Sequence, residues 1–259
     1  MAALYDTIGL DYRRHRRPDP RLAEIIVRGL GPARTIVNVG AGAGSYEPPD
    51  RRVIAVEPSV VMLRQRARDA APAVQASAMA LPFRDAAFDA SMAILTVHHW
   101  PDWRTGIKEL RRVAGGRVVI VTWDPGHPGF WLTDYIPELL AADRRIFPTL
   151  PQLGGALGSM TVAELPIPHD CSDGVLGAYW RRPEAYLNEE VRSAISTFSK
   201  VGDVSPALRR LRQDLDTGDW HRRYGAIMDL SELDLGYRIL ICDQAGLPAT
   251  LKVRRLSTV

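Results

Sequence analysis

Three glycines at alternate positions follow directly on an apolar strand in the first quarter of the chain. Residues 35–44, Thr-Ile-Val-Asn-Val-Gly-Ala-Gly-Ala-Gly, place Gly40, Gly42 and Gly44 where the β-branched stretch ends. Glycine adopts positive φ and lets backbone N–H groups approach a ligand closely, so this junction predicts a loop that wraps a small polar molecule. The next apolar strand ends in Glu57, an acid that the rim of a parallel sheet would offer to a ribose. Strand, loop, strand and acid in this order predict a nucleotide-type cofactor site.

The spacing of the glycines separates two kinds of cofactor. Dinucleotide folds use G-x-G-x-x-G, whereas this chain has G-x-G-x-G, with Glu57 13 residues after Gly44 (57 − 44). The compact pattern resembles the S-adenosylmethionine (SAM) loop of class I methyltransferases. Residues 75–83 resemble that family's loop beside the adenine, and residues 88–100 resemble its fourth strand with the segment that follows the strand. A His-His-Trp after the fourth strand and a Tyr-rich leader look closest to the small-molecule methyltransferases called type 11, and the resemblance covers roughly residues 1–124.

The resemblance implies a SAM-dependent methyltransferase and assigns roles to individual residues. The glycine loop would hold the methionine part of SAM, Glu57 would accept hydrogen bonds from the ribose hydroxyls, and Met62 would line the adenine. In the leader, Tyr12 and Arg16 match positions that close over the cofactor, and Arg16 would make a bidentate contact with the methionine carboxylate. The complete set of cofactor-binding residues that we predict is Tyr12, Arg16, Asn38, Gly40, Ala41, Gly42, Glu57, Pro58, Met62, Ser77, Ala78, Met79 and Ile94.

Two residues depart from the family pattern. Asn38 stands where the motif usually has Asp or Glu, and Ser77 stands where an Asp commonly meets the adenine amine. Asparagine donates and accepts hydrogen bonds but brings no charge for the ammonium of SAM. We expect both changes to weaken SAM binding. They also leave open a second interpretation, a module that binds SAM or its product without catalysis.

His98 and His99 are the catalytic candidates, because they follow the fourth strand at the rim where SAM and acceptor would meet. Methyl transfer from a sulfonium is an in-line displacement that needs the nucleophile about 3 Å from the methyl group, and histidine can act as a general base near neutral pH. A capping or packing role is the alternative, and the sequence does not distinguish the two histidines. Five aromatic residues are candidates either for the acceptor wall or for core packing: Trp100, Trp123, Trp131, Tyr179 and Trp180.

Composition excludes several classes of protein. Of 259 residues, 46% are hydrophobic and 24% charged, which is typical of a globular protein with a buried core. The net charge of +3 is too small to indicate a nucleic-acid partner, so we expect a small-molecule acceptor and disfavour an RNA methyltransferase. Cys171 and Cys242 form no C-x-x-C pair, so neither a metal site nor a disulfide framework is predicted, and buried thiols are favoured.

Other features of the sequence bear on location and on a rival activity. We expect a cytoplasmic protein without a membrane partner, because no apolar leader and no apolar stretch of membrane-spanning length is present. The oligomeric state is not predicted. A nicotinamide-dependent oxidoreductase is disfavoured by the glycine spacing and by the lack of a Tyr-x-x-x-Lys pair.

Alternating apolar runs and helical patterns predict an α/β protein with five β/α repeats in a doubly wound sheet. The resemblance implies the Rossmann-like methyltransferase fold, with seven mostly parallel strands and the last strand, residues 236–242, antiparallel beside the fifth. We assign residues 1–124 to a SAM-binding core with an N-terminal lid. The Pro- and Gly-rich aromatic segment 125–160 would be a cap over the acceptor pocket, and residues 161–259, with a sixth strand at 162–167, would complete the sheet and add helices.

Overall fold

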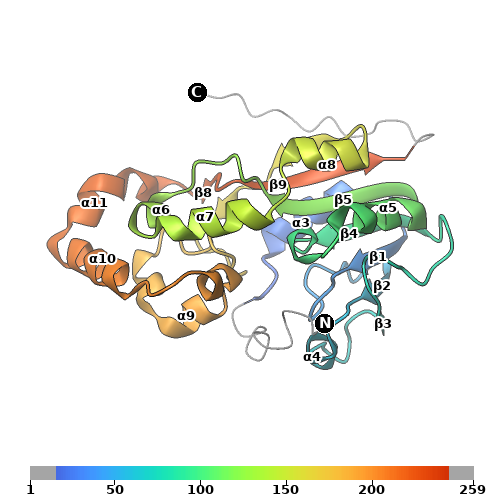
Figure 1. The fold of residues 1–259 in the computed structure, drawn as a ribbon, viewed down its shortest axis with the longest axis horizontal. Helices are drawn as coiled ribbons and strands as arrows, with labels where there is room; N and C mark the ends of the chain where they lie inside the picture. The colour runs from blue at the N-terminus through green and yellow to red at the C-terminus, as the bar shows by residue number, and fades with distance from the viewer. Residues whose placement is uncertain (1–15, 245–259) are drawn as a thin grey trace.

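A seven-stranded sheet forms the centre of the protein (Figure 1). The computed structural model describes residues 16–244. The strands lie in the order β3 (Ala73–Val74), β2 (Arg52–Val56), β1 (Thr35–Val39), β4 (Phe88–Ile94), β5 (Ala114–Trp123), β9 (Tyr237–Asp243) and β6 (Thr161–Glu164). Strands β1 to β5 pair in parallel, and β9 runs antiparallel to both of its neighbours. The predicted doubly wound, mostly parallel sheet is therefore confirmed.

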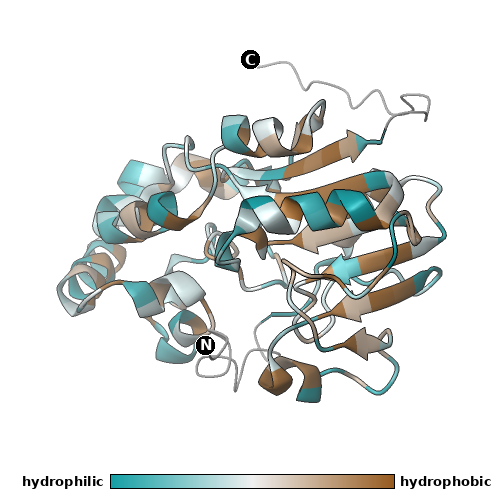
Figure 2. Cartoon of the chain, turned by 45° about the vertical axis from the view of Figure 1, so that its right-hand side comes forward, coloured by the Kyte–Doolittle hydropathy of each residue, from teal (hydrophilic) through white to brown (hydrophobic). Residues whose placement is uncertain are grey.

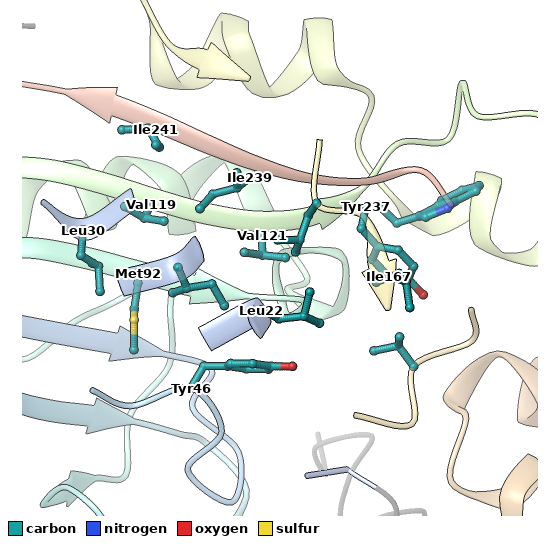
Figure 3. Close-up of a cluster of buried hydrophobic side chains, with 14 of the residues drawn as sticks. Leu22, Leu30, Tyr46, Met92, Val119, Val121, Ile167, Tyr237, Ile239 and Ile241 are labelled. Atoms are coloured by element: carbon teal, nitrogen blue, oxygen red, sulfur yellow. The ribbon is translucent and has the colours of Figure 1, made fainter. Parts of the chain in front are cut away.

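Helices cover both faces of this sheet, so its central strands are apolar on both sides. Alternate residues of β1 and β5 belong to two different buried clusters, Ile36 and Val119 to one and Val37 and Val118 to the other. Helix α3 (Pro20–Leu30) covers the first face, and Figure 3 shows its Leu22 and Leu30 among side chains of β4, β5 and β9. Helices α5 (Trp103–Val113) and α8 (Leu150–Leu157) cover the second face. Figure 2 shows the apolar residues concentrated along the strands.

Side chains cap the starts of two helices. The Asp19 side chain accepts a hydrogen bond from the backbone N–H of Arg21 at the start of α3, and Ser59 caps α4 (Val60–Arg64) by accepting from Met62 N–H. Helix α4 is short and ends at Arg64. Two residues further on, the guanidinium of Arg66 donates to the carbonyl of Gly42 in the glycine loop and to the carboxylate of Glu47.

Segment 125–160, expected to be a cap, divides between two layers. Helices α6 (Trp131–Tyr135) and α7 (Pro137–Ile146) lie beyond the carboxyl ends of the strands. Helix α8 instead packs on α5, and its Leu153 and Leu157 are buried in the same cluster as Ile107 and Leu110. Only the first two helices of this segment can therefore contact a molecule bound at that end of the sheet.

A third buried cluster joins α6 to residues that come later in the chain. Its members include Trp131, Tyr186, Leu211 and Trp220. They come from α6, η2 (Pro183–Leu187), α10 (Ser205–Thr217) and α11 (Asp219–Tyr224). Helices α6, α10 and α11 lie together on the left of Figure 1. The Nε1–H of Trp131 donates to the carbonyl of Trp180 at 2.7 Å, and both rings are buried. For these two tryptophans the structure supports core packing.

The predicted sixth strand is shorter than expected. Strand β6 ends at Glu164, and residues 167 and 168 form a separate short strand, β7 (Ile167–Pro168), which pairs with β8 (Glu232–Leu233). The remaining described elements are η1 (Val97–His99), α9 (Glu189–Ser193), η3 (Ser196–Lys200) and η4 (Gly225–Asp229). Cys171 and Cys242 are buried free thiols, as predicted. In the described part of the chain no helix is long and apolar enough to cross a membrane.

Candidate active site

A cavity of about 430 Å³ opens where β1, β2, β3 and β4 end. The carboxyl ends of parallel strands meet at one edge of a sheet, so the segments that follow these strands converge there. Every predicted cofactor residue within the described part of the chain lines this cavity: Arg16, Asn38, Gly40, Ala41, Gly42, Glu57, Pro58, Met62, Ser77, Ala78, Met79 and Ile94. Tyr12 lies outside the described residues.

The glycine loop crosses the end of β4 so closely that position 40 has no room for a side chain. Gly40 has a φ of 71°, and a Cβ atom there would lie 2.1 Å from Oγ1 of Thr96. Its N–H donates to the carbonyl of Val56 at 2.8 Å, which ties the loop to the end of β2. Gly42 has a φ of 54°, and its Cβ would come 3.2 Å from Cε of Met62. Both positions favour glycine because L residues are strained at positive φ.

Glu57 is held between the loop and the start of α4. Its side chain is buried, with 6% of its surface exposed. One carboxylate oxygen accepts the N–H of Gly42 at 2.9 Å, and the other accepts the N–H of Ser59 at 3.0 Å. These backbone bonds fix the orientation of a carboxylate that lines the cavity.

The structure gives a physical reason for asparagine at position 38. The amide nitrogen of Asn38 donates to Oε1 of Glu47 at 3.2 Å. Glu47 is buried and pairs with Arg66 at 2.8 Å, and Arg66 also donates to the carbonyl of Gly42 at 3.4 Å. An aspartate at position 38 would place a second carboxylate against Glu47, which like-charge repulsion disfavours. The neutral amide instead joins a buried brace beneath the glycine loop.

Ser77 belongs to the loop that follows β3. Its hydroxyl accepts the N–H of Met79 at 3.3 Å, which stabilises the turn beside the cavity. Its side chain therefore shapes the segment that was predicted to meet the adenine.

Arg16 forms a partly buried ion pair that the sequence did not reveal. Its Nε donates to Oδ1 of Asp173 at 2.5 Å and its NH2 to Oδ2 at 3.4 Å. The hydroxyl of Tyr46 donates to the same carboxylate at 2.8 Å, and burial, with the nearby Asp173, raises the pKa of Tyr46. Arg16 and Tyr46 both line the cavity. The guanidinium thus contacts a carboxylate of the protein here, and its contact with a bound methionine carboxylate stays a prediction.

A second, smaller cavity of about 70 Å³ lies beside the first. Arg16, Leu95 and His99 line both cavities and so form their common wall. Leu95 has a φ of 50°, an uncommon and strained conformation for a residue with a branched side chain. The other walls are mainly apolar and come from the segments that contain Trp123, Phe130, Leu140, Phe147, Val175, Leu176, Ile195, Leu235 and Tyr237.

The structure distinguishes the two histidines. His98 lines only the smaller cavity, and its ring stacks on Phe147 with centroids 3.8 Å apart. His99 stands at the common wall. Burial, with Lys200 and Arg16 adding to it, lowers the pKa of His99 to about 3, and burial together with His99 lowers the pKa of His98 well below its usual value. Both rings are therefore neutral at pH 7. An imidazole with so low a pKa is a weak base, so it can accept a hydrogen bond and orient the donor but does not readily hold a transferred proton.

Asp143 is a site residue that sequence reasoning missed. It lies on α7 and lines the smaller cavity, with only 6% of its surface exposed. Thr197 Oγ1 donates to its carboxylate, at 3.0 and 3.2 Å from the two oxygens. Burial raises the pKa of Asp143 to about 6. No local motif marks this residue, because its partner comes from a segment far along the chain.

Comparison with known proteins supports the interpretation of this geometry. A family model described as a methyltransferase domain matches residues 37–120. A solved structure of a putative methyltransferase from an antibiotic biosynthesis pathway of Anabaena variabilis is 33% identical, with a TM-score of 0.82 over 88% of this chain and 98% of that one. The chain belongs to the class I SAM-dependent methyltransferases. SAM is accordingly the cofactor of this methyltransferase.

The curated relatives match a shorter part of this chain than that solved structure does. An uncharacterized protein of Mycobacterium tuberculosis is 31% identical over 111 residues, which are 38% of this chain and 40% of that protein. A demethylmenaquinone methyltransferase of Corynebacterium urealyticum is 27% identical over 132 residues, 48% of this chain and 57% of that enzyme. The methyltransferase thus spans 40% of the length of the first curated relatives that it matches.

Among residues 16–244, no group of three or more His, Cys, Asp or Glu side chains is arranged to hold a metal ion.

Proposed function

We propose that the methyltransferase holds SAM in the larger cavity and transfers its methyl group to a small, largely apolar acceptor in the smaller one. The observation that carries this proposal is the common wall of Arg16, Leu95 and His99. In-line displacement at a sulfonium needs the acceptor atom about 3 Å from the methyl group at a site with little water. Two adjacent cavities, the smaller one lined mainly by apolar side chains, suit this requirement.

The larger cavity offers a donor or acceptor for each part of SAM. Glu57 would accept the ribose hydroxyls, since its carboxylate is already oriented by Gly42 and Ser59. The backbone of the glycine loop would contact the methionine part, and residues 77–79 would lie along the adenine. Because Asn38 is neutral, it offers no opposite charge to the ammonium of SAM. Contacts with the ribose and with the glycine loop therefore supply most of the affinity.

The lining of the smaller cavity supports an acceptor that is apolar and small. Aromatic and aliphatic side chains such as Phe130, Phe147 and Leu235 make up most of its wall. Two of the relatives are named a demethylmenaquinone methyltransferase and a malonyl-[acyl-carrier protein] O-methyltransferase. These names indicate different acceptors, so the chemistry of the smaller cavity is the better basis for inferring the class of acceptor. A net charge of +3 over 259 residues gives no support to a nucleic-acid acceptor.

Calorimetry with SAM, S-adenosylhomocysteine and NAD(P), followed by a transfer assay, tests this proposal. We expect SAM and S-adenosylhomocysteine to compete for one site and NAD(P) not to bind. With methyl-labelled SAM, the label should move to members of a panel of apolar phenols, amines and carboxylic acids. Binding of NAD(P) in place of SAM, or transfer of label to RNA alone, would contradict the proposal. SAM binding without transfer to any acceptor class would support the non-catalytic module.

A further inference from the structure

Asp143 is a carboxylate placed against the mainly apolar acceptor cavity by the geometry of α7. Residues four apart lie on one face of a helix, about one turn from each other. Phe147, the residue that ends α7, stacks on His98 with centroids 3.8 Å apart, and its backbone N–H donates to the carbonyl of Asp143 at 3.0 Å. Asp143, four residues earlier, lines the same cavity as Phe147 and His98. Its position therefore follows from the packing that builds the cavity.

The contacts of Asp143 use only part of its hydrogen-bonding capacity. A carboxylate has about four acceptor sites. Thr197 Oγ1 is the one hydrogen-bond donor to it among residues 16–244, and a hydroxyl has a single proton to give. In the same part of the chain, no Lys, Arg or His nitrogen lies within 4.0 Å of the carboxylate. Buried polar groups are normally paired, so a carboxylate with 6% exposure and one donor has acceptor capacity for a ligand.

The groups around Asp143 do not supply the missing donors. Lys200, on the same segment as Thr197, influences the pKa of the carboxyl but forms no ion pair with it. His98 and His99 line the cavity as neutral rings, and Arg16 is engaged by Asp173. Asp143 thus meets this cavity as an acceptor of hydrogen bonds.

We propose that Asp143 is the polar contact by which the methyltransferase selects its acceptor, and that this acceptor is an apolar small molecule bearing a hydroxyl or amino group. This inference rests on the proposed function of the smaller cavity. The donor group of the acceptor hydrogen-bonds to the carboxylate, while its hydrocarbon part contacts Phe130, Phe147 and Leu235. Asp143 is a specificity residue in this account, and the proton that an O–H or N–H acceptor loses on methylation passes to water.

Binding of matched probes to the full chain saturated with S-adenosylhomocysteine tests the inference. The probes are 4-ethylphenol and 4-ethylaniline, with 4-ethyltoluene as the probe of the same shape that lacks a donor. Dissociation constants are measured by NMR titration for the wild-type protein, Asp143→Leu and Thr197→Val. The second variant is the control for a purely structural role, because it breaks the bond between the two residues but leaves the carboxylate in the cavity.

In the wild-type protein we expect the phenol and the aniline to bind roughly tenfold more tightly than the toluene, as a hydrogen bond to a charged group implies. The preference should disappear in Asp143→Leu and persist in Thr197→Val. Glu138→Gln, which changes an exposed acid on the same helix, should behave as the wild type. Asp143→Asn keeps the acceptor oxygen but loses the charge, so it should retain more of the preference for the phenol than of the preference for the aniline.

The inference would be overturned if the wild-type protein bound all three probes equally or bound none of them. It would also be overturned if the preference for the phenol and the aniline survived in Asp143→Leu, or if Thr197→Val lost that preference as fully as Asp143→Leu. Calorimetry with SAM separates this failure from that of the proposed function. If SAM binds to the wild-type protein and the probes show no dependence on Asp143, only the inference about the acceptor fails. If SAM does not bind, both fail.

Discussion

Replacing Glu57 with glutamine removes the charge that we assign to the ribose of SAM while keeping the size of the side chain. In the structure its two oxygens accept the backbone N–H groups of Gly42 and Ser59 at 2.9 and 3.0 Å. Glutamine has one acceptor oxygen, so one of these buried N–H groups would face an amide NH2. Hydrogen bonds to charged groups contribute about 1.5–3 kcal/mol, so losing one from the ribose should weaken SAM binding by roughly 10- to 150-fold.

The same substitution has a separate cost in stability. An unsatisfied buried donor costs about 1–3 kcal/mol, which corresponds to a Tm lower by roughly 2–12 °C for a chain of this size. Calorimetry with SAM measures the affinity, and thermal unfolding without ligand shows how much of the variant is folded. Glu164→Gln is the matched control, because Glu164 is exposed on β6 at the opposite edge of the sheet from β2 and β3.

Unchanged SAM affinity in a folded Glu57→Gln variant would refute this reasoning. It would remove Glu57 from the cofactor site and, with it, the assignment of the ribose to the end of β2. An equal loss of affinity in Glu164→Gln would show that the effect is not local to the cavity.

Three further substitutions test other parts of the site. Gly40→Ala should abolish SAM binding in a folded protein, because the new Cβ would lie 2.1 Å from Oγ1 of Thr96. Gly155→Ala is the control, since no atom lies within 4 Å of its Cβ, and it should leave the SAM affinity measured by calorimetry unchanged. Equal SAM affinities of the two variants would contradict the loop geometry. Asp173→Asn should lower the free energy of unfolding in urea by about 1–3 kcal/mol, since it removes the charge from a partly buried ion pair, and no measurable loss would mean that the pair is in effect solvated. The lowered pKa of His98 means that the folded protein binds fewer protons than the unfolded chain below about pH 6.5, so stability falls as the pH falls through that range. His98→Phe should therefore lose less stability than the wild type between about pH 7 and pH 5 in urea unfolding, and parallel losses would show that the pKa of His98 is not lowered.

The cofactor cavity could be predicted from the sequence because its parts are local. The glycines after β1 and Glu57 after β2 each stand at the end of an apolar strand, and parallel strands bring their carboxyl ends to one edge. The antiparallel place of β9 came from the family resemblance, since no local pattern fixes which neighbour a last strand pairs with. Position 38 shows the limit of that resemblance, because the reason for its asparagine is a buried carboxylate at Glu47 that only the fold brings near.

Features that depend on distant contacts could not be predicted. Asp143 and Thr197 are 54 residues apart, and Arg16 and Asp173 are 157 apart, so no spacing in the sequence links them. Helix α8 was not predicted, because its proline and glycines are typical of loops. One available signal was overlooked there, since Thr149 and Gln152 form the capping box that starts this helix.

A crystal structure of the methyltransferase with S-adenosylhomocysteine tests the central claim most directly. The account predicts that the product occupies the cavity of about 430 Å³, with its ribose hydroxyls on the carboxylate of Glu57. Its sulfur should face the common wall at Leu95 and His99, so that a methyl group on it would point toward the smaller cavity. A product bound elsewhere, or one whose sulfur faces away from that wall with its ribose distant from Glu57, would contradict the account.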